Sequence, residues 1–245
     1  MAEFFPTGDT MEIGSEPQRK AARLAGFLYL FTNLVAIFAF VVRGRVIVKG
    51  EAAQTANNIL AAGPLFRAAI AAELICVAGT IALVVALYVV LRPINRNLAL
   101  LAVSWRIVEN ATLAVVTIAE FAMLTLLGHD AYLHAVGTPQ LQSLAYASLH
   151  IYGAGFNVGF VFLGLGSALF SYLWLKSRYI PRLIAGWGLF ASSMMAASML
   201  VIIIFPNLTE PLSVFYLAPM GIYEIGLGLW LLIKGIRLPQ TTTAA

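Results

Sequence analysis

The chain has 245 residues, of which 61% are hydrophobic and 11% are charged, and its mean hydropathy is +0.89. Soluble domains typically have about 25% charged residues, so this composition excludes an ordinary soluble domain and indicates an integral membrane protein. The formal charge of +4 comes with no basic helix or aromatic–basic cluster outside the apolar runs, so we expect no nucleic-acid partner. The single cysteine, Cys76, excludes an intrachain disulfide.

The chain begins with a polar, acidic segment, residues 1–18, which we interpret as a disordered cytoplasmic tail and not as a signal peptide. Six apolar segments follow, each of about 20 residues or more, which is enough to cross a bilayer as a helix. They run over residues 21–42, 65–91, 98–127, 150–175, 183–205 and 213–236. The predicted fold is all-α: a polytopic six-helix transmembrane bundle over residues 19–237, with a C-terminal tail at 238–245.

Lys and Arg residues concentrate in alternate connections of this predicted bundle. One side carries Arg19, Lys20, Arg23, Arg92, Arg96, Lys176, Arg178, Arg182, Lys234 and Arg237. The positive-inside rule makes that side cytoplasmic, so we expect both termini in the cytoplasm. Arg43, Arg45, Lys49 and Arg67 fall on the other side. The rule gives no account of the first three.

Two outer connections, residues 43–64 and 128–149, are long enough to contain short interfacial helices. In the second, Thr138 and Pro139 predict a helix start, with Thr138 as the N-cap. A helix from there to Lys176 would be about 57 Å long and would overshoot the bilayer, so we expect a break near residues 153–155. His129, Asp130 and His134 match no standard metal-ligand spacing, and we expect no metal site there.

Polar residues inside the predicted spans provide the best functional clue. Counted from the cytoplasmic basic residues, Asn33, Arg106, Glu109 and Glu224 come about 15–20 Å deep. Glu73 and Asn157 come at about 28 Å. Arg67, Glu120 and His150 come at about 36–39 Å, at the outer interface, where solvation would explain them. Charges within a bilayer are costly and usually mark a functional site.

Helical geometry gathers several of these residues on one side of the segment 98–127. At about 100° per residue, Arg106, Glu109, Asn110, Thr117 and Glu120 share one face. A polar face of this kind is expected to point to the bundle interior or to a water-filled cavity. The candidate ligand-binding residues are Asn33, Glu73, Arg106, Glu109, Asn110, Glu120, His150, Asn157 and Glu224.

The same residues have a purely structural interpretation. Arg106 and Glu109, with Glu224, could form an interhelical ion pair that only holds the bundle together. Two carboxylates against one guanidinium leave an imbalance, however, so one Glu is expected to be protonated or to meet a cation.

Small residues on the segment 150–175 indicate where helices pack closely. Gly155, Gly159 and Gly166 lie on one side, and Gly164 lies on another. Small residues let helix backbones approach each other in membranes, so we expect this helix to be the packing centre.

Six stretches of the sequence, in order and spacing, resemble a known family. They are residues 23–29, 55–60, 65–67, 86–100, 155–164 and 229–235. Over residues 19–237 the chain resembles the bacterial membrane family catalogued as domain of unknown function 4386. The resemblance implies a six-helix, multi-pass protein of the plasma (inner) membrane of a prokaryote. It implies no activity, so no catalytic residue is assigned.

Three functional hypotheses remain open. The first is a protein that binds or moves a small molecule or ion through a cavity lined by the segment 98–127. The second is an interaction or sensing module in which the buried charges are structural. The third is an intramembrane enzyme acting on a lipid-like substrate. The absence of standard catalytic signatures argues against a conventional enzyme, and no cofactor is expected. Membrane lipids are the expected partners, and the sequence does not determine an oligomeric state.

Overall fold

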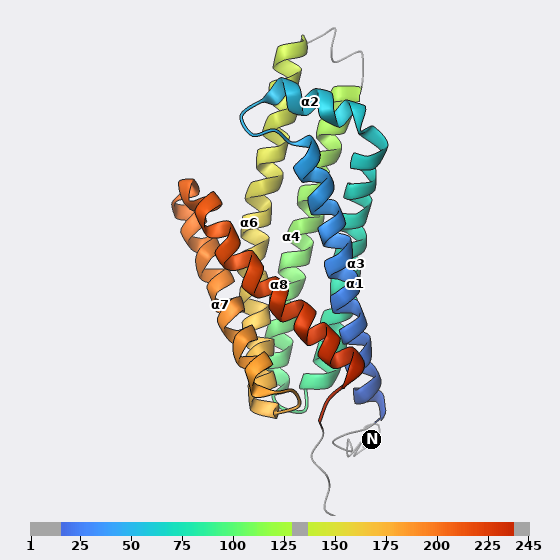
Figure 1. The fold of residues 1–245 in the computed structure, drawn as a ribbon, viewed down its shortest axis with the longest axis vertical. Coiled ribbons are helices and arrows are strands. Elements are labelled where there is room, and N and C mark those ends of the chain that lie inside the picture. The colour runs from blue at the N-terminus through green and yellow to red at the C-terminus, as the bar shows by residue number, and fades with distance from the viewer. Residues whose placement is uncertain (1–15, 129–136, 238–245) are drawn as a thin grey trace, which may run out of the picture.

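The computed structural model of the chain describes residues 16–128 and 137–237. Within them it contains helices and no strand (Figure 1). The elements are α1 (Glu16–Val46), α2 (Ala52–Ala61), α3 (Gly63–Leu91), α4 (Arg96–Gly128), α6 (Thr138–Ser177), α7 (Arg182–Ile204), the 3-10 helix η1 (Pro206–Leu208) and α8 (Thr209–Ile233). α1, α3, α4, α6, α7 and the η1–α8 segment are long and apolar enough to cross a membrane. The predicted all-α bundle with six spans is confirmed.

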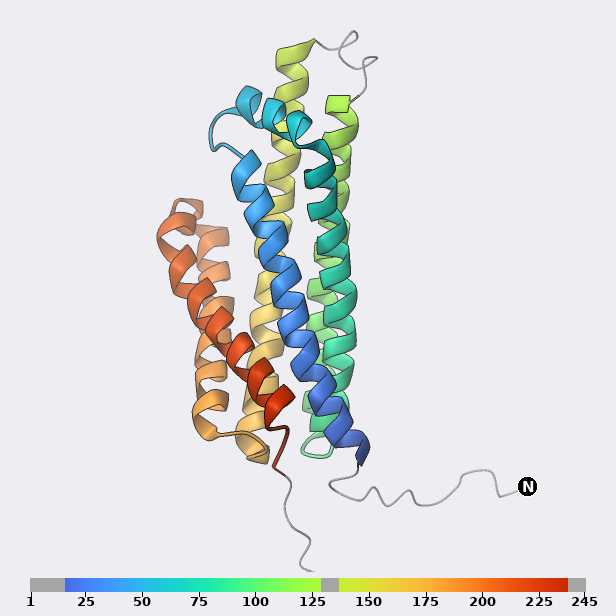
Figure 2. The same cartoon turned by 45° about the vertical axis from the view of Figure 1, so that its right-hand side comes forward.

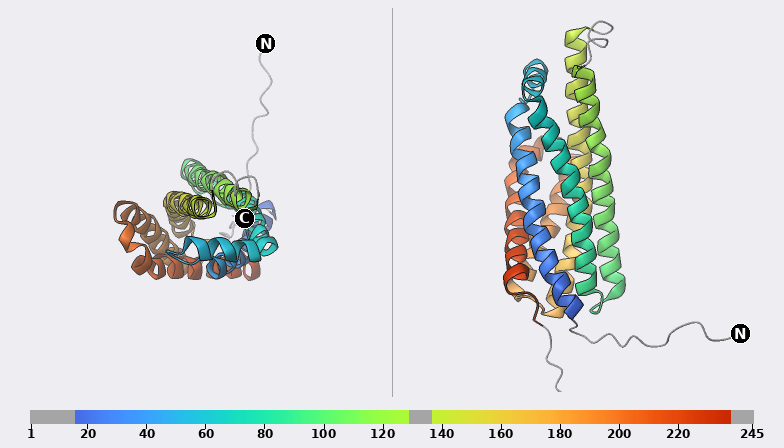
Figure 3. Two further views of the ribbon diagram at one scale, coloured as in Figure 1. Left: turned by 90° about the horizontal axis from the view of Figure 1, so that it is seen from above. Right: turned by 90° about the vertical axis from the view of Figure 1, so that its right-hand side faces the viewer.

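The six long helices form a ring. Each packs against two neighbours in the order α1, α3, α4, α6, α7, α8 and back to α1, as the view along the bundle shows (Figure 3, left). α3 and α6 also meet. In the described part of the chain, the backbones of α1 and α8 do not approach those of α4 and α6, and contacts across the ring are made by side chains, such as Ser171 of α6, which donates to the Tyr223 hydroxyl of α8 at 2.9 Å. Side chains therefore fill the centre of the ring.

Glycines allow neighbouring helices of this ring to approach each other closely. Gly155, Gly159 and Gly166 of α6 face α4, whereas Gly164 faces α7, where an added Cβ would lie 2.6 Å from Ala196 N. On the opposite side of the ring, a Cβ on Gly26 of α1 would lie 2.5 Å from Leu232 N of α8. α6 is thus packed closely on two sides, as the positions of its small residues predict.

α6 is a single unbroken helix of 40 residues, about 60 Å long. The break predicted near residues 153–155 is wrong, because Gly155 packs directly on Val116 of the neighbouring 33-residue helix α4. The pair α4–α6 therefore extends past the outer ends of α7 and α8 (Figure 2). The N-cap of α6 is Gly137, one residue before the predicted Thr138. His129, Asp130 and His134 lie outside the described residues.

α2 is the short outer helix predicted for the first connection. Its Ile59 is fully buried in an apolar cluster with Phe66, Met123 and Leu149, so α2 covers the outer end of the ring. At the other end, α1 begins at Glu16, inside the segment expected to be a tail. There Gln18 Nε2 donates to Val90 O at 2.7 Å.

Candidate functional site

The polar face of α4 lies in the centre of the ring. Arg106, Glu109, Asn110, Thr117 and Glu120 are all buried, whereas Val115 and Ile118 on the opposite face are exposed. α4 is therefore polar inside and apolar outside, as expected for a helix whose outer face meets lipid. The predicted orientation of this face toward the bundle interior is confirmed.

Four side chains from four helices form an outer cluster, defined as Arg43, Glu73, Glu120 and Tyr152. Arg43 Nε and Nη2 donate to the two carboxylate oxygens of Glu120, each at 2.7 Å. Arg43 Nη1 lies 2.9 Å from Glu73 Oε2, which also accepts a 3.0 Å hydrogen bond from the Tyr152 hydroxyl. The guanidinium also lies 4.8 Å from the centre of the Tyr152 ring. The cluster links α1, α3, α4 and α6.

The outer cluster corrects the expectation for Glu120. Solvation at the outer interface was expected, but Glu120 is 0% exposed because Arg43 reaches it from α1 across the ring. In the sequence, Arg43 falls in a predicted connection, so it was missed as a site residue. Charge balance could have found it, because Glu73 and Glu120 had no predicted basic partner.

Four further side chains form an inner cluster, defined as Asn33, Arg106, Glu109 and Glu224. Asn33 Nδ2 donates to Glu224 Oε2 at 3.0 Å, which connects α1 to α8. Arg106 Nη1 lies 3.0 Å from Glu109 Oε2, three residues along α4. Arg106 and Glu224 also interact electrostatically, which couples the two pairs across the ring. The structure thus brings together the four residues that the depth count placed near mid-membrane.

One carboxylate oxygen of Glu109 accepts no hydrogen bond in this cluster. Its Oε2 is close to Arg106 Nη1, but no N–H points along the contact, and the atom has no hydrogen-bond donor among the described residues. The residue is only 2% exposed. A buried carboxylate oxygen without a donor is costly, and such groups concentrate at functional sites.

Neighbouring residues fix the position of Arg106. Its Cγ and Cδ lie over Gly166 of α6, where an added Cβ would come within 2.7 Å of Cγ. Arg106 Nη1 donates to Ser167 Oγ at a long 3.4 Å, and Asn110 Nδ2 donates to the Arg106 backbone oxygen at 2.7 Å. The glycine therefore leaves room for the arginine stem. Asn110 donates back to the backbone of its own helix.

One family's sequence profile matches residues 24–235, which include all eight members of the two clusters. The chain belongs to the family described as Domain of unknown function (DUF4386). The family resemblance seen in the sequence is confirmed. No curated protein and no solved structure matches the chain. The six long apolar helices indicate an integral membrane protein, and the family description carries no activity to the two clusters.

Two of the nine candidates lie away from both clusters in this member of the family. His150 is exposed on α6, and its Nδ1 is 3.0 Å from Tyr146 O of the preceding turn. Asn157 is half-buried on α6. A recess found in the described chain is lined by Pro139, Gln140, Ser143 and Leu144, so none of the nine candidates contributes to it.

Proposed function

We propose that this protein binds and moves a small cation through the centre of its helix ring, with Glu109 and Glu224 as the binding carboxylates. The observation that carries the proposal is the buried Glu109 Oε2, which lacks a hydrogen-bond donor beside the Arg106 guanidinium, with Glu224 as a second carboxylate of the same cluster. A cation or a proton supplies the charge that this arrangement lacks.

The charges favour a cation over an anion. Arg106 is the cation of the inner cluster, and its guanidinium is already engaged by Glu109 and by Ser167. Its positive charge is already balanced by the Glu109 carboxylate, so an added anion would find no uncompensated positive charge in the cluster. The inner cluster has two carboxylates but one guanidinium, so its charge favours a cation. A bound proton on Glu109 would be released when a metal or ammonium cation takes its place. The proposal therefore predicts that the protein exchanges protons for cations.

The polar groups of the ring centre suggest a path to the outer end. Cys76 lies on α3 three residues after Glu73 of the outer cluster, and its Sγ lies 3.6 Å from the backbone oxygen of Thr32, the residue before Asn33 of the inner cluster. It therefore lies between the two clusters. In this proposal the outer cluster closes the path, and a cation entering from the outer end requires Arg43 to release Glu73 or Glu120.

The family resemblance and the charge bias support two accompanying proposals. The first is that residues 19–237 form one transmembrane domain in the plasma membrane of a prokaryote. The second is that both termini lie in the cytoplasm, because ten basic residues lie at the end of the bundle where the described chain begins and ends.

Reconstituted vesicles with a trapped pH-sensitive dye test the transport step. A Na⁺ or K⁺ gradient imposed on the wild-type protein should change the luminal pH, and Glu109→Gln should abolish that change while the protein still unfolds cooperatively in detergent. Glu51→Gln is the matched control, since Glu51 is exposed at the outer end and should keep full activity.

Proton release on adding Na⁺ or K⁺ to the lightly buffered, detergent-solubilised protein tests binding without transport. Wild type should release protons, and Glu109→Gln should not. The proposal would be contradicted if Glu109→Gln exchanged protons for Na⁺ or K⁺ as fully as the wild type does. It would also be contradicted if the wild type moved no protons in either assay.

A further inference from the structure

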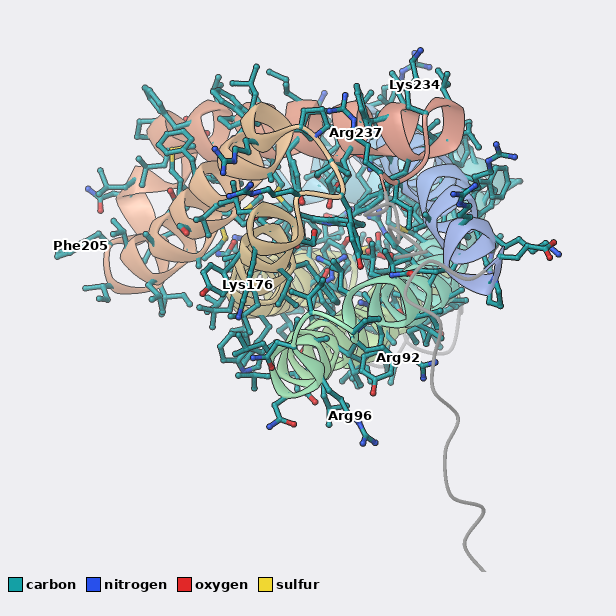
Figure 4. The ribbon with its side chains drawn as sticks, turned by 90° about the horizontal axis from the view of Figure 1, so that it is seen from below. Arg92, Arg96, Lys176, Phe205, Lys234 and Arg237 are labelled. Atoms are coloured by element: carbon teal, nitrogen blue, oxygen red, sulfur yellow. The ribbon has the colours of Figure 1, made fainter. Side chains whose placement is uncertain are left out.

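We infer that the basic end of the bundle binds the phosphate groups of acidic phospholipids. Its ten basic side chains are Arg19, Lys20, Arg23, Arg92, Arg96, Lys176, Arg178, Arg182, Lys234 and Arg237. Viewed from this end, Arg92, Arg96, Lys176, Lys234 and Arg237 lie around the helix ends (Figure 4). The inference does not depend on the proposed cation site.

The two ends of the bundle differ in charge balance. At the basic end the one acidic residue of the described chain is Glu16, which already pairs with Lys20 at 2.7 Å. At the outer end, exposed Arg45, Lys49 and Arg67 face exposed Glu51 and Glu210, and Lys49 pairs with Glu210. The basic end therefore carries a positive charge excess, which attracts anions.

One corner of this end is held in a fixed arrangement. The turn between α6 and α7 carries Arg178 and Arg182, and it is anchored by Tyr179, whose side chain is buried. The Tyr179 carbonyl accepts a 2.9 Å hydrogen bond from the backbone N–H of Arg237. This hydrogen bond joins the α6–α7 turn to the segment after α8. Both segments have exposed arginines and no acidic residue.

An aromatic ring supports the same corner. The Arg237 guanidinium lies 5.6 Å from the centre of the Trp230 ring, and the Trp230 indole N–H has no acceptor among the described residues. A tryptophan beside basic residues at a helix end is typical of the headgroup layer of a membrane. Phosphate and ester oxygens of a lipid are acceptors that suit the exposed guanidinium of Arg237. Acidic lipids of the cytoplasmic leaflet attract such basic clusters.

Native mass spectrometry of the full-length protein in neutral detergent tests this inference. Phosphatidylglycerol should stay bound under conditions that remove phosphatidylcholine. The double variant Arg178→Gln with Arg237→Gln should bind phosphatidylglycerol at least tenfold more weakly, given about fivefold for each charge removed. The matched control is Arg45→Gln with Arg67→Gln at the outer end, which should bind as the wild type does.

Inorganic phosphate in excess separates a lipid site from a site for free phosphate. It should leave phosphatidylglycerol bound, because it lacks the acyl chains that hold the headgroup at the bundle. Complete displacement by inorganic phosphate, equal retention of the two lipids, or equal losses in the two double variants would overturn the inference.

Discussion

The outer and inner clusters are built from the same charges, one arginine and two glutamates, but they satisfy those charges differently. In the outer cluster Arg43 donates to both oxygens of Glu120, and its third nitrogen meets Glu73. In the inner cluster Arg106 is close to Glu109 without an aligned hydrogen bond. Hydrogen-bond geometry, and not the number of buried charges, therefore distinguishes a structural clamp from a candidate site.

The difference has a geometric cause. Arg43 comes from α1 and reaches across the ring, so its planar guanidinium can align with carboxylates on two other helices. Arg106 and Glu109 lie three residues apart on the same helix, and the helix fixes the spacing of their side chains. The inner pair has a single contact, from Nη1 to Oε2, and does not form the two-bond geometry that satisfies Glu120.

Removing the arginine of the outer cluster should have the largest effect on stability. Arg43→Ala leaves Glu73 and Glu120 buried without their cation and should lower the free energy of unfolding by about 3–5 kcal/mol. Denaturant unfolding in detergent micelles measures this. Arg45→Ala, two residues further along α1 and exposed, should unfold as the wild type does. A small loss for Arg43→Ala would show that the outer cluster is not a clamp.

The same carboxylate-to-amide change in both clusters tests the comparison directly. Glu120→Gln weakens two charge-assisted hydrogen bonds and should cost about 2–3 kcal/mol of unfolding free energy. Glu109→Gln replaces a buried carboxyl group whose Oε2 has no hydrogen-bond donor, and it should change stability by less than about 1 kcal/mol. Unfolding of the two variants under identical conditions gives the difference. Equal costs would remove the distinction between the clusters.

The smallest effect is expected at the exposed ion pair between Lys49 and Glu210. Solvent screens this pair, so Lys49→Ala should leave the midpoint of thermal unfolding unchanged within error. Differential scanning fluorimetry of wild type and variant measures this. A clear drop in the midpoint would show that the pair holds α8 to the α1–α2 connection, and that exposed charges contribute as the outer cluster does.

Much of the architecture is predictable from local sequence. Apolar runs of sufficient length specify six spans, because each span satisfies its own backbone hydrogen bonds. The 3.6-residue period alone puts Arg106, Glu109 and Glu120 on one face of α4. Similarly, Gly155 and Gly164 predict that α6 packs closely against other helices, although they do not identify those helices.

The sequence by itself thus determined the class of protein, the number of spans and the polar face of α4, and it predicted a common depth for Asn33, Arg106, Glu109 and Glu224. Only the tertiary structure decided that Arg43 turns inward to meet Glu120, that α6 continues past residues 153–155, and that Glu109 lacks a hydrogen-bond donor. The period of a helix is a local property, whereas the pairing of charges depends on which helices face each other across the ring.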